Sequence, residues 1–223
     1  MTSAKDVFIK CDELDRLPPE NRDNYLFELE WLAEELPRGC NVLQVGSMDG
    51  MRALRLLEAR PDLRITGLEI ESDLVKLAAE NTARYGDHAS FVHGDITQPP
   101  DGLDAYTYVI CLNNTLGFIP DVERAIEQMK RLGHTVVISV YGERFDEPLA
   151  RRYFAAIGLT IREFADDMIT LQDFSSVRRF PRSAVLAWRG DSLVETPIGY
   201  LTTLSGLIPR RRDGSTHDPQ AKA

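Results

Sequence analysis

The chain has 223 residues, with 26 basic and 35 acidic side chains that give a formal net charge of −9 at pH 7. This length predicts one domain with a core large enough to fold without disulfides. The composition, 43% hydrophobic and 27% charged, excludes collagen-like, disordered and disulfide-scaffold proteins. The acidic balance argues against nucleic-acid binding, because the chain repels phosphates.

Targeting and metal-binding patterns are absent from the sequence. The N-terminus mixes charges and has no apolar signal-peptide core, and every apolar run is shorter than a bilayer span. We therefore expect a cytoplasmic protein that does not contact membranes. The three cysteines and four histidines have no metal-ligand spacing. They predict buried thiols in a reducing compartment and no metal site.

Short β-branched runs alternate with helical segments, which is typical of a parallel sheet with helices on both faces. Hydrophobic spacing predicts helices over 21–36, 51–60, 73–85, 120–132 and 147–157. Apolar runs predict strands over 41–45, 64–70, 90–92, 106–112 and 135–141. We expect Ser72 to cap the third helix. Three later runs predict strands without helices between them, at an antiparallel sheet edge: 160–164, 168–174 and 183–188.

The domain organisation follows from these elements. We expect a single domain over 1–208, with a helical cap at 1–38 and the sheet core at 39–190. The remaining residues, 209–223, are polar and predict a mobile tail.

A glycine-containing loop joins the first strand to the following helix, from Gly46 to Gly50. Such a loop lets a ligand approach the backbone, and the helix N-terminus favours polar or anionic groups. The dinucleotide pattern G-x-G-x-x-G fails, because Met48 and Met51 occupy two of its positions. An ordinary strand-to-helix turn explains the loop equally well.

Glu69 ends the second predicted strand, 19 residues after Gly50. A carboxylate at this place can accept both hydroxyls of a ribose. A solvated acid at a strand end is the simpler alternative for Glu69 alone. The loop and Glu69 together favour a nucleoside-containing cofactor.

Polar residues also follow the third and fourth strands. Asp95 is placed to accept from a purine amine, with Ile96 against the ring, although a Gly-Asp turn explains Asp95 by itself. Asn113 and Asn114 follow the fourth strand at its carboxyl end, where open α/β sheets bind ligands. An asparagine-rich turn before a helix is the alternative.

These four pieces together resemble class I S-adenosylmethionine-dependent methyltransferases, over about residues 21–188. The family's first loop has an acidic residue and three alternating glycines. Here Gly46 and Gly50 match, Gln44 replaces the acid and Met48 the middle glycine. The resemblance implies an α/β fold: a Rossmann-like, doubly wound, seven-stranded and mostly parallel sheet with an antiparallel edge strand. It also implies S-adenosyl-L-methionine as the cofactor.

The resemblance assigns roles to individual residues. Glu69 would bind the ribose, Asp95 and Ile96 the adenine, and Asn113 the methionine region. The full cofactor set is Gln44, Gly46, Ser47, Met48, Gly50, Glu69, Ile70, Asp95, Ile96 and Asn113. The substrate set is Tyr25, from a cap over the cofactor, with Asn114, Tyr141 and Glu143.

Tyr141 and Glu143 would meet a substrate ammonium by cation–π and charge contacts. A strand-end tyrosine packed on the next helix is the competing explanation for Tyr141. No catalytic residue can be named, because methyl transfer from a sulfonium needs mainly orientation and desolvation.

We expect methyl transfer to a small molecule, with N-methylation of an amine or amino-acid-like substrate as one form. An RNA or protein methyltransferase of the same fold is an alternative, which the acidic charge disfavours for RNA. A non-catalytic regulator that binds a nucleoside or a partner stays open because of Gln44 and Met48. A nicotinamide-dependent reductase is disfavoured by the glycine pattern. A homodimer is one assembly that the sequence allows.

Overall fold

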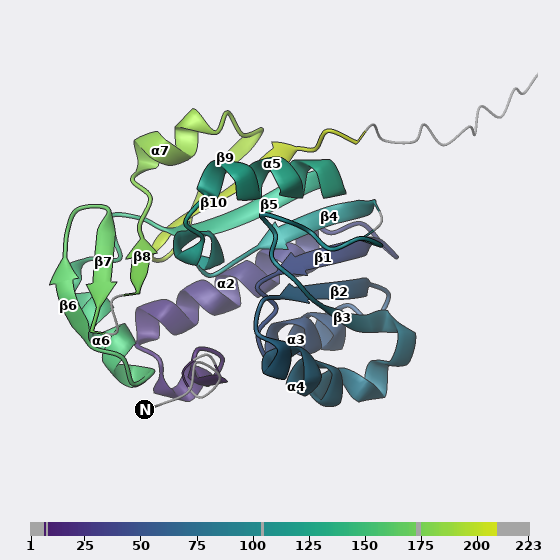
Figure 1. Ribbon diagram of the computed structural model, residues 1–223, viewed down its shortest axis with the longest axis horizontal. Coiled ribbons are helices and arrows are strands. Elements are labelled where there is room, and N and C mark those ends of the chain that lie inside the picture. The colour runs from purple at the N-terminus through teal and green to yellow at the C-terminus, as the bar shows by residue number, and fades with distance from the viewer. Residues whose placement is uncertain (1–6, 8, 104, 173–174, 209–223) are drawn as a thin grey trace, which may run out of the picture.

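The computed structural model describes residues 7, 9–103, 105–172 and 175–208 (Figure 1). The predicted tail, 209–223, lies outside the described residues. A seven-stranded sheet crosses the molecule, in the order β3-β2-β1-β4-β5-β10-β9. Its strands are β1 (Asn41–Val45), β2 (Arg64–Glu69), β3 (Ala89–His93), β4 (Tyr106–Cys111), β5 (Gly133–Tyr141), β9 (Ser192–Glu195) and β10 (Gly199–Ser205).

The first five strands are mutually parallel, and β10 pairs antiparallel with both β5 and β9. The predicted seven-stranded, mostly parallel sheet is thus confirmed. Its antiparallel strand lies one position in from the edge, because β9 covers it. The main helices are α2 (Pro19–Glu35), α3 (Met51–Ala59), α4 (Ser72–Thr82), α5 (Val122–Leu132), α6 (Glu147–Ala156) and α7 (Arg182–Ala187). Short 3-10 turns are η1 (Leu14–Arg16), η2 (Ala83–His88) and η3 (Thr115–Phe118).

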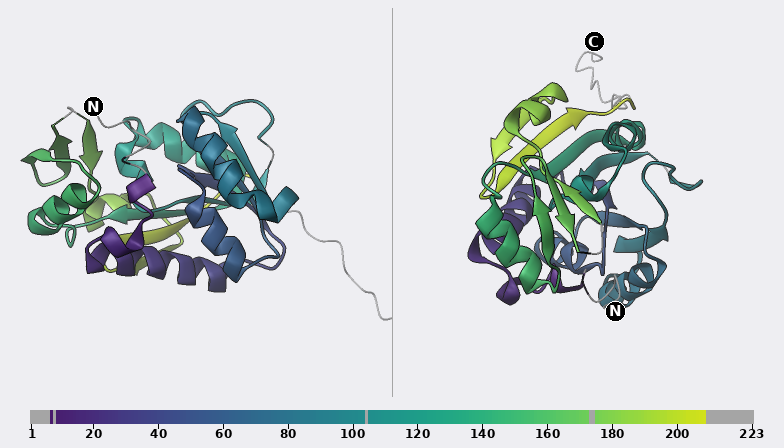
Figure 2. Two further views of the ribbon diagram at one scale, coloured as in Figure 1. Left: turned by 90° about the horizontal axis from the view of Figure 1, so that it is seen from below. Right: turned by 60° about the vertical axis from the view of Figure 1, so that its left-hand side comes forward.

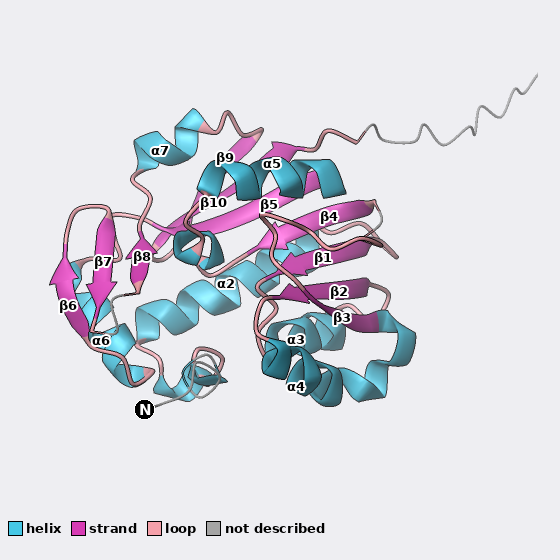
Figure 3. Cartoon of the chain, in the orientation of Figure 1, coloured by secondary structure: helices cyan, strands magenta, loops and turns pink. Residues whose placement is uncertain are grey.

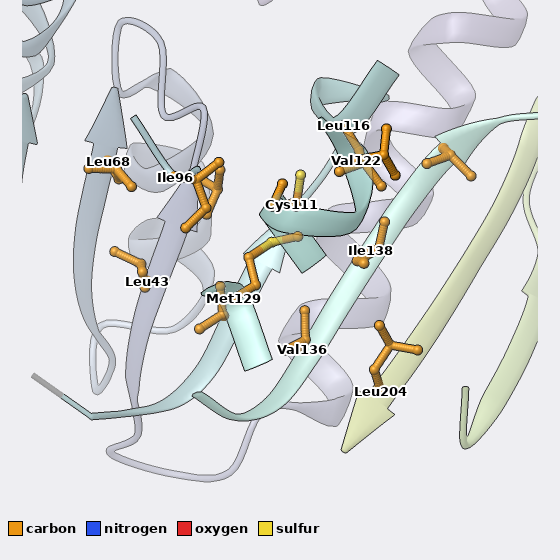
Figure 4. Close-up of a cluster of buried hydrophobic side chains, with 14 of the residues drawn as sticks. Leu43, Leu68, Ile96, Cys111, Leu116, Val122, Met129, Val136, Ile138 and Leu204 are labelled. Carbon is orange, nitrogen blue, oxygen red and sulfur yellow. The ribbon is translucent and has the colours of Figure 1, made fainter. Parts of the chain in front are cut away.

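Helices cover both faces of the sheet, with α2 and α3 on one side and α5 on the other (Figure 2). The central strands β1 and β5 are rich in apolar residues because both of their faces are buried over most of their length. Figure 4 shows the cluster on the α5 side, where Met129 packs toward Val136 and Leu43. These layers hold the carboxyl ends of the parallel strands along one edge.

A second, three-stranded antiparallel sheet lies apart from the first, beside α6 (Figure 3). It contains β6 (Ile161–Phe164), β7 (Met168–Leu171) and β8 (Ser176–Arg178). The strands expected over 160–164 and 168–174 therefore form, as far as they are described, but they do not make the edge of the main sheet. That edge is made by β9 and β10, which lie beyond residue 190, where we expected the core to end.

Two other local predictions were wrong. The apolar run 183–188 is helix α7, because Pro181 precedes the helix and a six-residue apolar run fits either structure. Only Val185 of that helix is fully buried. Ser72 begins α4, but the N-cap is Glu71 and no side chain caps the helix there. The elements predicted over 21–157 otherwise have the expected type.

Candidate functional site

A cavity of about 500 Å³ lies at the carboxyl ends of the central parallel strands. This volume is within the range of small-ligand pockets. Most of its lining comes from the loops that follow β1, β2, β3 and β4. The N-terminal segment adds Cys11, and α6 adds Tyr153. The cavity thus collects residues that are distant in the sequence.

The glycine loop takes its shape from left-handed backbone conformations. Gly46 has φ of +68°, and a Cβ there would lie 2.4 Å from the Thr115 side chain. Gly50 has φ of +78° and precedes α3, and its Cβ would lie 2.9 Å from Ala78. Met48 also has positive φ, at +51°. A methionine can therefore replace the family's middle glycine, at a cost of about 1–2 kcal/mol in backbone strain.

Glu69 ends β2 and is a buried residue, only 6% exposed. The carboxylate accepts backbone hydrogen bonds from Met48 (2.8 Å), Ile70 (2.9 Å) and Glu71 (3.1 Å). Burial raises the pKa of Glu69 above its usual value, and these three amide donors oppose that shift. A carboxylate has about four lone-pair positions, so the Glu69 group retains room for a further donor.

The two asparagines after β4 have different surroundings, although both have positive φ. Asn113 lines the cavity and accepts from the Tyr141 hydroxyl at 2.9 Å. Asn114 is fully buried. Its amide donates to the Arg178 carbonyl at 3.0 Å and accepts from the Tyr141 backbone N–H at 3.1 Å. Asn114 therefore ties β5 to β8 beneath the site.

Seven of the residues predicted to bind the cofactor line the cavity. They are Gly46, Met48, Glu69, Ile70, Asp95, Ile96 and Asn113. The other three, Gln44, Ser47 and Gly50, lie in or just before the loop but outside the lining.

The four predicted substrate residues all lie outside the cavity lining. Tyr25 is fully buried, with the Arg52 guanidinium 3.8 Å from its ring centre. Tyr141 and Asn114 support the loop after β4. Glu143 accepts from the Tyr200 hydroxyl at 2.6 Å and from the Arg182 backbone at 2.9 Å, at the side of the sheet.

Several of the residues that line the cavity were not predicted from the sequence. Cys11 and Tyr153 come from segments that only tertiary packing brings to the site. Residues 115–121 follow Asn114 directly and continue the loop at the carboxyl end of β4, so their place in the sequence could have indicated that several of them line the cavity. The lining residues missed are Cys11, Val45, Leu68, Glu71, Gly94, Thr97, Thr115, Phe118, Ile119, Pro120, Asp121 and Tyr153.

The charged side chains in the lining are all acidic. They are Glu69, Glu71, Asp95 and Asp121, and no lysine, arginine or histidine is among the described lining residues. Such a cavity favours ligands with cationic groups over phosphates and carboxylates.

No group of three or more His, Cys, Asp or Glu side chains is arranged to hold a metal ion in the part of the chain that the structure describes. No helix among the same residues has the length and apolar character needed to span a membrane.

Residues 42–134 match the family model of a methyltransferase domain. This segment runs from β1 to the start of β5 and includes most of the cavity loops. No curated protein matches the chain.

Many solved structures share the fold. A S-adenosylmethionine-dependent methyltransferase from Clostridium acetobutylicum matches with a TM-score of 0.61 and 10% identity, over 83% of this chain and 92% of the other. The PH0226 protein from Pyrococcus horikoshii matches with a TM-score of 0.61 and 15% identity, over 86% and 93%. The CcbJ methyltransferase from Streptomyces caelestis matches with a TM-score of 0.57 and 16% identity, over 85% and 96%.

Some other structures are matched over only about three fifths of their length, 61% and 63% in two cases. At these identities the structures support the fold alone. The domain match indicates methyl transfer as the activity class of residues 42–134. The chain thus has the Rossmann-like fold of S-adenosylmethionine-dependent methyltransferases, and its residues 42–134 match a methyltransferase domain.

Proposed function

We propose that the cavity holds S-adenosylmethionine and a small-molecule methyl acceptor with an amine or amino-acid-like group. The observation that carries the cofactor placement is Glu69, a carboxylate fixed by three backbone amides at the tip of β2. Glu69 would accept from the ribose hydroxyls. Asp95 and Ile96 would hold the adenine, and Gly46, Met48 and Asn113 the methionine end.

The residues present fit this cofactor. The cavity volume of about 500 Å³ is within the range of pockets that bind small ligands. Gly46 has no Cβ, which keeps space beside Thr115.

An amine acceptor is supported by the charge of the cavity. Its carboxylates attract a cation, and the described lining has no basic side chain to hold an anionic acceptor. The same charge disfavours the phosphates of RNA.

The bound cofactor supplies an electrophilic methyl group on sulfur. The role of the protein's own residues would be to orient the acceptor nitrogen toward this methyl group and to exclude water. Tyr153 does not act as a base, because burial raises the pKa of its hydroxyl well above 10. The acceptor amine would thus enter neutral or release its proton to solvent, and Tyr153 and Asn113 would orient it.

The test is methyl transfer from a labelled cofactor to a panel of small primary and secondary amines, amino acids and amine-free carboxylic acids. We expect transfer to amine-containing compounds and none to the amine-free acids. Transfer only to the acids, or only to RNA or protein acceptors supplied in parallel, would overturn the proposed substrate class.

A further inference from the structure

Asn113 lies at the cavity wall in a backbone conformation that few residue types adopt. It lines the cavity and is half-buried, with φ of +50°, and the next residue, Asn114, has φ of +60°. Two successive residues in the left-handed region cost energy, which the surrounding contacts must offset. The contacts that hold Asn113 come from α2 and β5, and neither of these two elements adds a residue to the cavity lining.

The side chain of Asn113 is held by Tyr141, the last residue of β5. The Tyr141 hydroxyl donates to Asn113 Oδ1 at 2.9 Å. Tyr141 is only 2% exposed, and its ring packs against Phe145 with 4.2 Å between the ring centres. Burial raises the pKa of the Tyr141 hydroxyl above its usual range, so the hydroxyl keeps its proton and remains a donor. The bond therefore directs Asn113 Oδ1 toward a residue outside the lining.

The backbone of Asn113 is held by Glu28, a fully buried residue of α2. Glu28 Oε1 accepts from the Asn113 backbone N–H at 3.1 Å and from the Ser139 hydroxyl at 2.5 Å. The same oxygen accepts from the Asn24 side chain at 3.0 Å, and Oε2 accepts from Arg52. Both carboxylate oxygens are thus in use, so a side chain with only one oxygen cannot make the same set of bonds.

These two anchors decide which group of Asn113 a ligand meets. A carboxamide has an oxygen that accepts and a nitrogen that donates two hydrogen bonds, and the two groups point in different directions. With Oδ1 bonded to Tyr141, the Nδ2 group is the donor that Asn113 can offer to the cavity. The charged side chains in the described lining are all acidic and repel a ligand carboxylate. A neutral donor such as Nδ2 can bind that carboxylate instead.

We propose that Tyr141 and Glu28 are positioning residues that fix Asn113 so that its Nδ2 group donates to the carboxylate at the methionine end of the cofactor. The proposal rests on the cofactor placement in the proposed function, in which Asn113 holds the methionine end. Tyr141 and Glu28 act on the ligand only through Asn113, because both lie outside the cavity lining.

Calorimetry with two nucleosides tests the role of Tyr141. S-adenosylhomocysteine has the amino-acid end, whereas 5′-methylthioadenosine has the adenosine and the sulfur but lacks that end. Tyr141→Phe removes the hydroxyl and keeps a ring that can pack against Phe145. We expect this variant to bind S-adenosylhomocysteine about tenfold more weakly than the wild type, and to bind 5′-methylthioadenosine within about twofold of it.

The matched control is Tyr200→Phe, which removes a hydroxyl that donates to Glu143 at the side of the sheet. This variant should bind both nucleosides as the wild type does. Equal weakening of both nucleosides by Tyr141→Phe would mean that the hydroxyl only supports the loop, and would overturn the proposal. Unchanged binding of S-adenosylhomocysteine would overturn it as well.

A double-mutant cycle tests whether Tyr141 acts through Asn113. Asn113→Gly removes the carboxamide and suits the positive φ, and it should weaken S-adenosylhomocysteine binding at least as much as Tyr141→Phe does. In the Asn113→Gly protein, adding Tyr141→Phe should change the affinity by less than about twofold, because the group that Tyr141 orients is gone. Losses that add in the double variant would contradict the proposal.

Hydrogen exchange in the ligand-free protein, followed by NMR, tests the role of Glu28. Glu28→Gln keeps the size of the side chain but has one acceptor oxygen, for which Arg52 and the Asn113 N–H compete. The exchange rate of the Asn113 amide is divided by that of Ile110, which lies in β4 between two paired strands. We expect this ratio to be at least about fivefold higher in Glu28→Gln than in the wild type.

Tyr141→Phe should also raise the exchange ratio, so the measurement can be made even if Glu28→Gln does not fold. Equal ratios in the wild type and the folded variants would overturn the positioning roles. If the wild type binds neither nucleoside, the cofactor placement fails, and the exchange ratios still decide whether Tyr141 and Glu28 hold Asn113.

Discussion

The backbone amide of Met48 donates to the carboxylate of Glu69 at 2.8 Å, and this bond joins the glycine loop to the tip of β2. Met48 adopts a conformation that favours glycine, with φ of +51°. The bond to Glu69 helps to hold that conformation. The residue proposed to bind the ribose therefore also supports the loop proposed to hold the methionine end.

Substitution of Glu69 tests the first half of this relationship. Glu69→Ala should weaken S-adenosylmethionine binding by about 1–3 kcal/mol, because a charged acceptor for the ribose is lost. Calorimetry of both proteins measures the difference. Glu80→Gln, on the exposed side of α4, is the control and should bind as the wild type. Unchanged affinity in Glu69→Ala would remove Glu69 from the site.

Substitution of Met48 tests whether its backbone conformation matters for the loop. Met48→Gly relieves the left-handed strain of about 1–2 kcal/mol and should keep cofactor affinity. Met48→Val places a β-branched side chain at positive φ and should lower both stability and affinity. Urea unfolding and calorimetry separate the two effects. Equal stability and equal affinity of Met48→Gly and Met48→Val would contradict a role for the positive φ at this position.

Alanine substitutions at two glycines distinguish the effect of backbone strain from that of steric crowding by a Cβ atom. Gly46 and Gly39 both have φ near +67°, but a Cβ at Gly39 meets nothing within 4 Å. Gly39→Ala should cost about 1 kcal/mol of stability and leave binding unchanged. Gly46→Ala should cost more and abolish tight S-adenosylhomocysteine binding, because its Cβ pushes Thr115. Similar losses in both variants would contradict the crowding at Gly46.

The stability of the protein should depend on pH through Asp49. Its pKa is raised from 3.8 to about 7 in the folded state, so the folded protein binds more protons than the unfolded chain between these values. The free energy of unfolding should therefore fall as the pH rises from about 4 to about 7, and this contribution is lost above pH 7. Urea unfolding at several pH values should show a smaller fall in Asp49→Asn. An identical fall in wild type and variant would exclude Asp49 as its source.

The buried ion pair between Glu28 and Arg52 makes a further prediction. Glu28 also accepts from the Asn113 backbone at 3.1 Å, next to the cavity. Glu28→Gln leaves the Arg52 charge buried without a partner and should destabilise the protein by about 3 kcal/mol. Chemical unfolding measures this, with Glu127→Gln as an exposed ion-pair control expected to lose under about 1 kcal/mol. Equal losses in the two variants would contradict the prediction.

The part of the site that the sequence predicts well is the part that follows strand ends. Glu69 ends β2, and Asp95 and Asn113 each lie two residues after the ends of β3 and β4. Parallel strands bring these carboxyl ends together at the cavity. The sheet itself follows from the same alternation of buried runs and amphipathic helices.

The missed features depend on packing between distant segments. Cys11 and Tyr153 reach the cavity through contacts between the N-terminal segment and α6, which leave no local pattern. Tyr25 was predicted to contact the substrate, because an aromatic ring can do so. In the structure it is buried, and Arg52 and Arg55 stack on its ring. The run 183–188 is too short for its periodicity to separate a strand from α7. A homodimer and a cytoplasmic location stay predictions.

Calorimetric titration of the purified protein with S-adenosylmethionine and S-adenosylhomocysteine, with NADH as the control, tests the cofactor placement most directly. We predict micromolar binding of the first two, no binding of NADH, and loss of affinity in Glu69→Ala. Absence of binding to a folded protein would contradict the placement, and would mean that the replacements at Gln44 and Met48 have disabled the site.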